Sequence, residues 1–121
     1  MNRFRAAVEA RDHEAFPALF AENIAFFSPV APPPFTGRDR VATILRAAFA
    51  VLEDFRYERE LASDDARDVA LPFQARIGAL PAQGCDFLHL DDHGLIDRFI
   101  VMLRPLPAVE AMAEAMSAQR R

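Results

Sequence analysis

The sequence predicts an α+β domain with a curved antiparallel sheet and a C-terminal helix. Helical patterns occupy the first part of the chain, and alternating apolar segments follow from residue 55 onward, an order typical of α+β domains. A last helical pattern closes the chain over residues 106–118. With 121 residues, of which 52% are hydrophobic, the chain is long enough for one core and too short for two. We therefore expect residues 1–121 to form a single domain.

The first helices are expected over residues 4–10 and 12–20. Asp12 is a good N-cap for the second, and Glu14 falls in its first turn, where the helix dipole favours a negative charge. A third helix is expected over residues 36–52. Its apolar residues recur at helical spacing: Val41, Ile44, Leu45, Ala48, Phe49 and Leu52.

Extended segments are expected at five places: residues 24–28, 55–61, 69–77, 84–90 and 95–104. The last two should form a hairpin across residues 91–94, whose Asp and Gly content suits a tight turn. Residues 29–34 are rich in proline, which cannot donate to a strand ladder, so this segment is expected to be a loop. Pro72 implies an edge position or a bulge in its strand.

Charge and composition exclude several classes of function. Fourteen basic and eighteen acidic residues give a net charge of −4, which disfavours binding to nucleic acid or to an anionic membrane. All basic residues are Arg, so Schiff-base chemistry on a lysine is excluded. No apolar segment approaches the length of a membrane span, and we expect the protein to be cytoplasmic.

Metal and cofactor sites are not expected. Cys85 is the only cysteine, which rules out a disulfide framework and a thiolate cluster. The three histidines fall on different elements without the spacing of a ligand motif. The glycines are too scattered for a phosphate-binding loop.

The last two strands are predicted to be apolar on both faces. Alternation puts Asp86 on one face and Phe87 and His89 on the other, where Ile100 and Met102 of the next strand join them. An antiparallel sheet with one face in water should alternate more cleanly. We therefore expect the outer face to be covered by a second copy of the chain, as a homodimer.

Three segments carry a resemblance to a known family. They are the strand end at Ser28 and Pro29, the loop end at residues 35–38 (FTGR), and residues 86–96 (DFLHLDDHGLI). Together with the helix pair they resemble the nuclear transport factor 2-like superfamily, and within it the SnoaL-like and ketosteroid isomerase-like branch. The resemblance implies a cone-shaped sheet wrapped around the N-terminal helices, with a deep hydrophobic pocket. Members include isomerases, polyketide cyclases, dehydratases, epoxide hydrolases and proteins that only bind, so the fold does not decide the function.

The resemblance also locates the residues of isomerase chemistry. In ketosteroid isomerases an aspartate base precedes the proline that ends the first strand, and Ser28 stands there in this chain. The family tyrosine of the first helix corresponds to Phe4, which has no hydroxyl. The acid on the oxyanion side has a counterpart in Asp86. Apolar surroundings should raise its pKa, so that it could donate a hydrogen bond when neutral or act as a base when ionised. The alternative is an Asp86 that bonds only water or backbone near the strand end.

The predicted pocket has Asp86 as its one strong polar group, and the other predicted substrate-binding residues are mostly apolar. They are Phe4, Val8, Phe20, Phe27, Ser28, Phe49, Phe73, Ala75, Leu88, Phe99, Val101 and Leu103. A pocket of this kind suits a small lipophilic molecule. Alternatively, the eleven phenylalanines fill the cone completely.

Two functions stay open on the sequence, and with them the question whether the protein is an enzyme. In the first, the protein binds a small lipophilic molecule and lacks the usual isomerase base. In the second, it is an isomerase, cyclase or dehydratase that acts on a lipophilic carbonyl compound, with Asp86 as acid or base.

Overall fold

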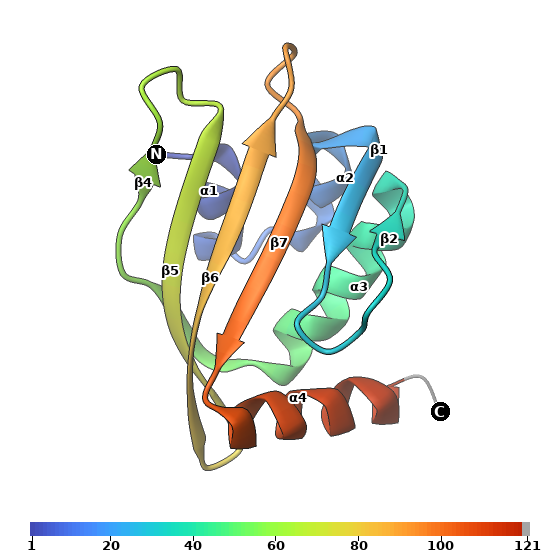
Figure 1. Cartoon of the computed structure of the whole chain (residues 1–121), viewed down its shortest axis with the longest axis vertical. Coiled ribbons are helices and arrows are strands. Elements are labelled where there is room, and N and C mark those ends of the chain that lie inside the picture. The colour runs from blue at the N-terminus through green and yellow to red at the C-terminus, as the bar shows by residue number, and fades with distance from the viewer. Residues whose placement is uncertain (120–121) are drawn as a thin grey trace.

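The structure, a computed structural model, describes residues 1–119 and consists of one curved sheet with helices on its inner side (Figure 1). The helices are α1 (Arg3–Glu9), the short 3-10 helix η1 (His13–Ala15), α2 (Phe16–Leu19), α3 (Arg38–Val51) and α4 (Leu106–Gln119). The strands are β1 (Phe20–Phe27), β2 (Phe35–Thr36), β3 (Glu53–Tyr57), β4 (Leu61–Ala62), β5 (Asp68–Ile77), β6 (Leu80–Leu90) and β7 (Ile96–Arg104). The predicted α+β class is confirmed.

The strands are ordered β2-β1-β7-β6-β5-β3, and β4 pairs with the other end of β5. Neighbouring strands are antiparallel, with the exception of β1 and β7, which pair in parallel. The sheet is therefore mixed, whereas the sequence predicted an antiparallel one. Because α3 and several strands separate β1 from β7, no tight turn forces these two strands to run in opposite directions.

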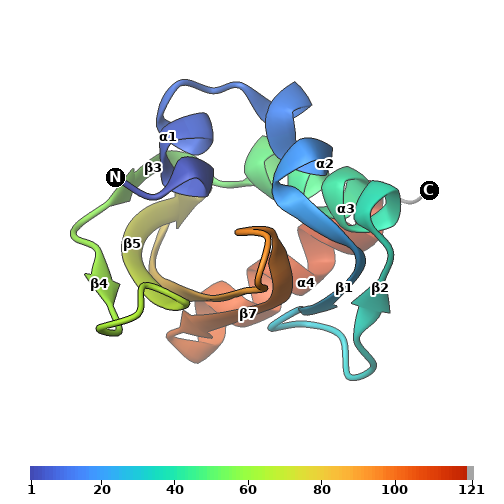
Figure 2. The same ribbon diagram turned by 90° about the horizontal axis from the view of Figure 1, so that it is seen from above.

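The curved sheet and its helices enclose the core (Figure 2). Helices α1, α2 and α3 lie over the inner face, and α4 lies across one end, against α3 and the ends of β5, β6 and β7. Aromatic rings fill the part of the core beneath α1 and α2. The Phe4 ring centroid lies 5.1 Å from that of Phe16 and 5.0 Å from that of Phe99. Such ring pairs contribute beyond the apolar area that they bury.

Several predicted element boundaries differ from the structure, among them the start of β6, which lies at Leu80 instead of residue 84. The predicted helix over residues 12–20 is broken into η1 and α2, and β1 begins at Phe20 instead of residue 24. The predicted strand over residues 55–61 is split into β3 and β4. Pro72 lies opposite this break, and its carbonyl oxygen accepts a hydrogen bond from the Glu58 N–H at 2.9 Å. The proline is therefore neither on an edge strand nor in a bulge of β5, because the break in the neighbouring strands removes the need for its N–H.

A glycine in β6 allows the close packing of an inner side chain. A Cβ atom added to Gly84 would overlap the ring of Phe73 on β5 and the carbonyl oxygen of Met102 on β7. The Phe73 ring thus lies directly on the β6 backbone, two residues from Asp86. This contact helps to shape the interior next to that carboxyl.

We predict that Gly84→Ala destabilises the fold by about 1–3 kcal/mol, because the added methyl group has no space and the ring or the strands must move. Urea unfolding measures the change. Gln83→Ala, an exposed substitution on the same strand, is the matched control and should change the free energy of unfolding by less than about 0.5 kcal/mol. Equal stability of the alanine variant and the wild type would contradict the close packing.

Candidate functional site

An inner cavity of about 50 Å³ lies between the sheet, α3, the loop after β1, and α4. It has room for one or two water molecules. Its wall is apolar except for Asp86 and Ser28. The other lining residues are Phe26, Pro29, Val30, Ile44, Leu45, Ala48, Phe49, Leu52, Phe55, Phe73, Val101, Leu103, Met112 and Met116.

Asp86 is the buried carboxyl of this cavity. It lies in the middle of β6, paired with Leu71 of β5 and Val101 of β7, and only 4% of its surface is exposed. The hydroxyl of Tyr57, at the end of β3, donates a hydrogen bond to Asp86 Oδ2 at 2.7 Å. The alternative of an Asp86 bonded only to water or backbone is therefore wrong, because a side-chain donor from another strand holds the carboxyl.

The environment of Asp86 favours its neutral form. Burial raises its pKa to about 7, although the hydrogen bond from Tyr57 acts in the opposite direction. The pKa of Tyr57 is raised well above its ordinary value, first by burial and then by the neighbouring Asp86, so Tyr57 remains a donor. Since Tyr57 occupies Oδ2, the proton of a neutral Asp86 belongs on Oδ1. The pair can thus offer a hydrogen bond to a carbonyl oxygen, or accept a proton once Asp86 is ionised.

The two positions where the resemblance places isomerase groups hold no acid or base. Ser28 lines the cavity, and its Oγ accepts a hydrogen bond from the Val30 N–H at 3.1 Å, which stabilises the start of the proline loop. Phe4 is buried among other aromatic rings and does not reach the cavity wall. Asp86 is thus the residue of the cavity wall with acid or base chemistry, and Tyr57 acts on it from outside the wall.

The structure brings part of the predicted residue set together. Around the cavity lie Ser28, Phe49, Phe73, Asp86, Val101 and Leu103. A second group is buried in the core away from the cavity wall: Phe4, Val8, Phe20, Ala75, Leu88 and Phe99. Phenyl rings therefore fill one part of the cone, and a small space remains near α4.

The prediction that Phe27 lines the inner pocket is wrong. Phe27 lines a groove on the outer face of the sheet, and Phe26 lines the inner cavity. Adjacent residues of a strand point to opposite faces, and two consecutive phenylalanines give no sign of which one points inward. Phe26 packs on Phe99, with ring centroids 5.4 Å apart, and this contact fixes the orientation of β1.

Sequence reasoning did not identify Tyr57, Met112 and Met116 as site residues. Tyr57 is the only tyrosine, and strand alternation puts it on the same face as Phe55, a signal that could have indicated a buried hydroxyl in need of a partner. The two methionines come from α4, whose docking position depends on the finished sheet. No pattern in the helix itself reveals that position.

Within residues 1–119, no group of three or more His, Cys, Asp or Glu side chains is arranged to hold a metal ion. No helix in the same residues is long and apolar enough to cross a bilayer.

Residues 1–99 match the SnoaL-like domain family, which is more than half of the chain. The chain belongs to this family. No curated protein matches the sequence of this SnoaL-like chain.

Solved structures agree with the assignment of the SnoaL-like chain. A steroid delta-isomerase from Pseudomonas aeruginosa is 38% identical, with a TM-score of 0.93 over 97% of this chain and 85% of that one. An uncharacterized protein with a cystatin-like fold from Silicibacter pomeroyi is also 38% identical, with a TM-score of 0.90 over 97% and 82% of the two chains. A nuclear transport factor 2-like protein from Cytophaga hutchinsonii, at 20% identity and TM-score 0.65 over 86% of each chain, shares the fold.

We predict that the stability of the SnoaL-like protein falls as the pH rises from 4 to 7, relative to that of Asp86→Asn. The ordinary pKa of 3.8 applies to the unfolded chain and a pKa of about 7 to the folded one. Between these pH values the folded state binds more protons than the unfolded state does. The contribution of Asp86 to the free energy of unfolding is therefore complete below pH 4 and is lost as the pH reaches 7. Three pH units correspond to roughly 4 kcal/mol.

Urea unfolding of both proteins between pH 4 and 8 tests this. Asp64→Asn, at an exposed carboxyl in a turn, is the control and should follow the wild type. A stability difference between the wild type and Asp86→Asn that does not vary with pH would show an Asp86 with an ordinary pKa.

Proposed function

We propose that this SnoaL-like protein binds a small lipophilic carbonyl compound in the inner cavity, with Asp86 as the polar anchor. The observation that carries the proposal is Asp86, buried in a wall that is apolar apart from Ser28 and held by the Tyr57 hydroxyl behind it. Apolar pockets with one or two placed polar groups are typical of sites for lipophilic ligands. A neutral carboxylic acid held by a tyrosine hydroxyl has a proton to donate and needs no cation beside it.

Ligand entry requires the cavity to enlarge. Pockets for drug-sized molecules have volumes of about 300 Å³ or more, and the cavity measures about 50 Å³. Met112 and Met116 of α4 form part of the wall, and methionine side chains adapt readily to the shape of a neighbour. Movement of these side chains, or of α4 with them, is the route by which space next to Asp86 would open.

A second candidate is an enzyme of the isomerase, cyclase or dehydratase type. Two observations favour it: the 38% identity to a steroid delta-isomerase and the pKa of Asp86 near 7, a value suited to proton transfer at neutral pH. Because Ser28 cannot act as the base, Asp86 itself would have to take a proton from the carbon next to the ligand carbonyl. The same carboxyl would then return the proton to another carbon of the ligand, so that no net proton is consumed.

Enone binding tests whether Asp86 donates a hydrogen bond to a ligand. The ultraviolet absorption of an enone shifts when its carbonyl oxygen accepts a hydrogen bond. Cyclohexenone and androstenedione serve as a small and a large probe. We predict that affinity for the bound probe falls about tenfold for each pH unit above 7, as Asp86 loses its proton. The affinity of Asp86→Asn should not change over the same range.

Tyr57→Phe distinguishes a positioning role of the tyrosine from simple packing. Since the Tyr57 hydroxyl lowers the pKa of Asp86, its removal should move the midpoint of the binding profile to higher pH. Conversion of the unconjugated isomer of cyclohexenone to the enone, at a rate that rises above pH 7 and disappears in Asp86→Asn, would support the enzyme. Binding that ignores pH, or no binding of either probe, would overturn the proposed role of Asp86.

We also propose that the protein forms a homodimer through the outer face of the sheet. Phe87 on β6 is 39% exposed, Met102 on β7 is 58% exposed and Leu61 on β4 is 54% exposed, and all three lie on this face or at its edge. Exposed apolar residues gathered on one face are characteristic of interaction sites.

We predict that Ile100→Glu, which places a charge among these residues, converts dimers into monomers. Sedimentation velocity measures the change. Thr43→Glu on α3, exposed on a different element, is the control and should leave the mass unchanged. Identical sedimentation of the wild type and Ile100→Glu would contradict a dimer through this face.

A further inference from the structure

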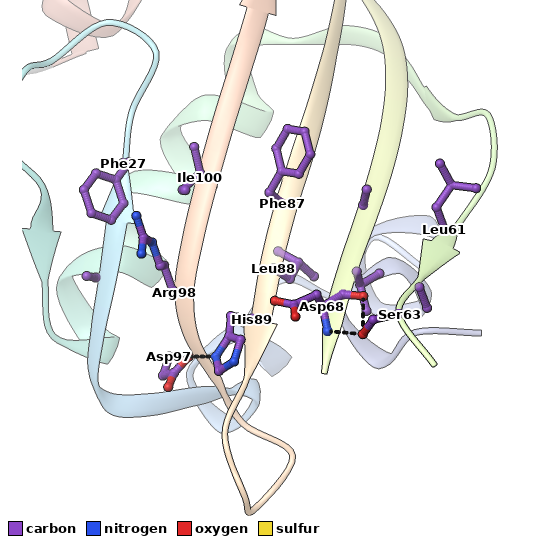
Figure 3. Close-up of a pocket in the computed structure, with 14 residues that line it drawn as sticks. Phe27, Leu61, Ser63, Asp68, Phe87, Leu88, His89, Asp97, Arg98 and Ile100 are labelled. Carbon is purple, nitrogen blue, oxygen red and sulfur yellow. Dashed lines mark hydrogen bonds and ion pairs between the residues drawn. The ribbon is translucent and has the colours of Figure 1, made fainter. Parts of the chain in front are cut away.

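The outer face of the sheet contains a groove of about 880 Å³ that spans five strands (Figure 3). Strand pairing aligns its apolar residues in one row across the sheet, which we call the apolar row. The row consists of Phe27 on β1, Ile100 on β7, Phe87 on β6, Ala70 on β5 and Leu61 on β4. Phe87 is its central member, with two residues on each side.

A second row, two residues further along the strands, carries charge. It consists of Arg98 on β7, His89 on β6 and Asp68 on β5, and we call it the charged row. It is also centred on β6, with a cation on one side and an anion on the other, each one strand away. Figure 3 shows Arg98 and Asp68 on opposite sides of His89.

We propose that the second copy packs on this face with the two-fold axis parallel to β6, so that Arg98 of each copy faces Asp68 of the other. The inference rests on the proposed homodimer and specifies its geometry. A rotation about an axis that runs along β6 between the two sheets keeps each row at its height and exchanges β5 with β7. The charged row of one copy then lies over that of the other in reverse order. Arg98 of each copy pairs with Asp68 of the other, which gives two identical ion pairs.

The state of the two charged groups agrees with this arrangement. Arg98 is exposed, and its guanidinium lies 5.1 Å from the centre of the Phe27 ring, which holds it on the face. In residues 1–119, neither Arg98 nor the carboxylate of Asp68 has an ion-pair partner. His89 between them is already paired with Asp97, with 2.7 Å from Nδ1 to Oδ1. Arg98 and Asp68 are thus the charged groups of this row without an ion-pair partner, and the rotation brings them together.

The apolar row fits the same rotation. It would bring Ile100 over Ala70 of the second copy, a large residue over a small one, and Phe27 over Leu61. Phe87 would meet its own counterpart on the axis. When two sheets pack face to face, their strand directions differ by about 30°. Arg98 and Asp68 lie only one strand, about 4.8 Å, from the axis, so this angle displaces them little.

An axis perpendicular to the strands fits less well. If it passed midway between Ile100 and Met102, β7 would lie over β7 of the second copy. Arg98 would then face Arg104, and the two cations would repel each other. Of these two arrangements, the axis along β6 is the one that places opposite charges together.

Mixing two charge-reversed variants tests the inference. Arg98→Glu and Asp68→Arg each place like charges in both contacts of their own homodimer, and each should weaken dimerisation about tenfold or more. In a mixed dimer both contacts again join opposite charges, since the introduced glutamate meets the introduced arginine and the native Arg98 meets the native Asp68. Native mass spectrometry of the mixture should show the mixed dimer well above the share expected from random association.

Arg104→Glu is the matched control, an exposed reversal on the same strand and face. It should leave the dimer unchanged if the axis follows β6, and strengthen it if the axis crosses the strands. Random association of the two variants, with Ile100→Glu still producing monomers, would overturn the proposed geometry and leave the dimer in place. A wild type that remains monomeric at all concentrations would overturn both.

Discussion

The hydrogen bond between Tyr57 and Asp86 is the constraint on which the inner side of the structure depends. A carboxyl with 4% exposure is costly to bury unless a partner satisfies it. The partner comes from β3, which reaches β6 only by lying along β5. This one contact is consistent with the position of β3 and with the break after Tyr57. It is also consistent with Pro72, which lies opposite that break. A lipophilic ligand in the cavity would meet Asp86 as the one carboxyl of the wall.

The same contact differs from what the resemblance to ketosteroid isomerases implied for this chain. The acid of the oxyanion side is present in Asp86, and its hydrogen-bond donor is Tyr57 on a strand, whereas the resemblance placed a tyrosine in the first helix. Ser28 stands where the resemblance places the base, and its hydroxyl accepts a hydrogen bond in a local turn. Both proposed roles, ligand binding and proton transfer, therefore depend on the single carboxyl of Asp86.

The sequence predicted the fold class, the long elements and the faces of β6 and β7 correctly. Alternation was informative there, because Asp86 beside Phe87 distinguishes the two faces. It was uninformative in β1, where Phe26 and Phe27 are chemically identical, and their orientation depends on contacts with β7. The partner of Asp86 lies 29 residues away on a strand that is not its neighbour, and no local pattern encodes that register. The volume left beside the carboxyl depends in the same way on how α4 docks.

Strand β6 serves the two faces with consecutive residues: Asp86 and Leu88 face inward, and Phe87 and His89 face outward. A one-residue insertion or deletion at the centre of this strand would exchange the faces of every following side chain. It would bring a phenyl ring to the cavity and a carboxylate to the apolar row, so the interior and the outer surface would fail together. Natural variation in β6 should therefore consist of substitutions, while changes of length should collect in the turns at either end.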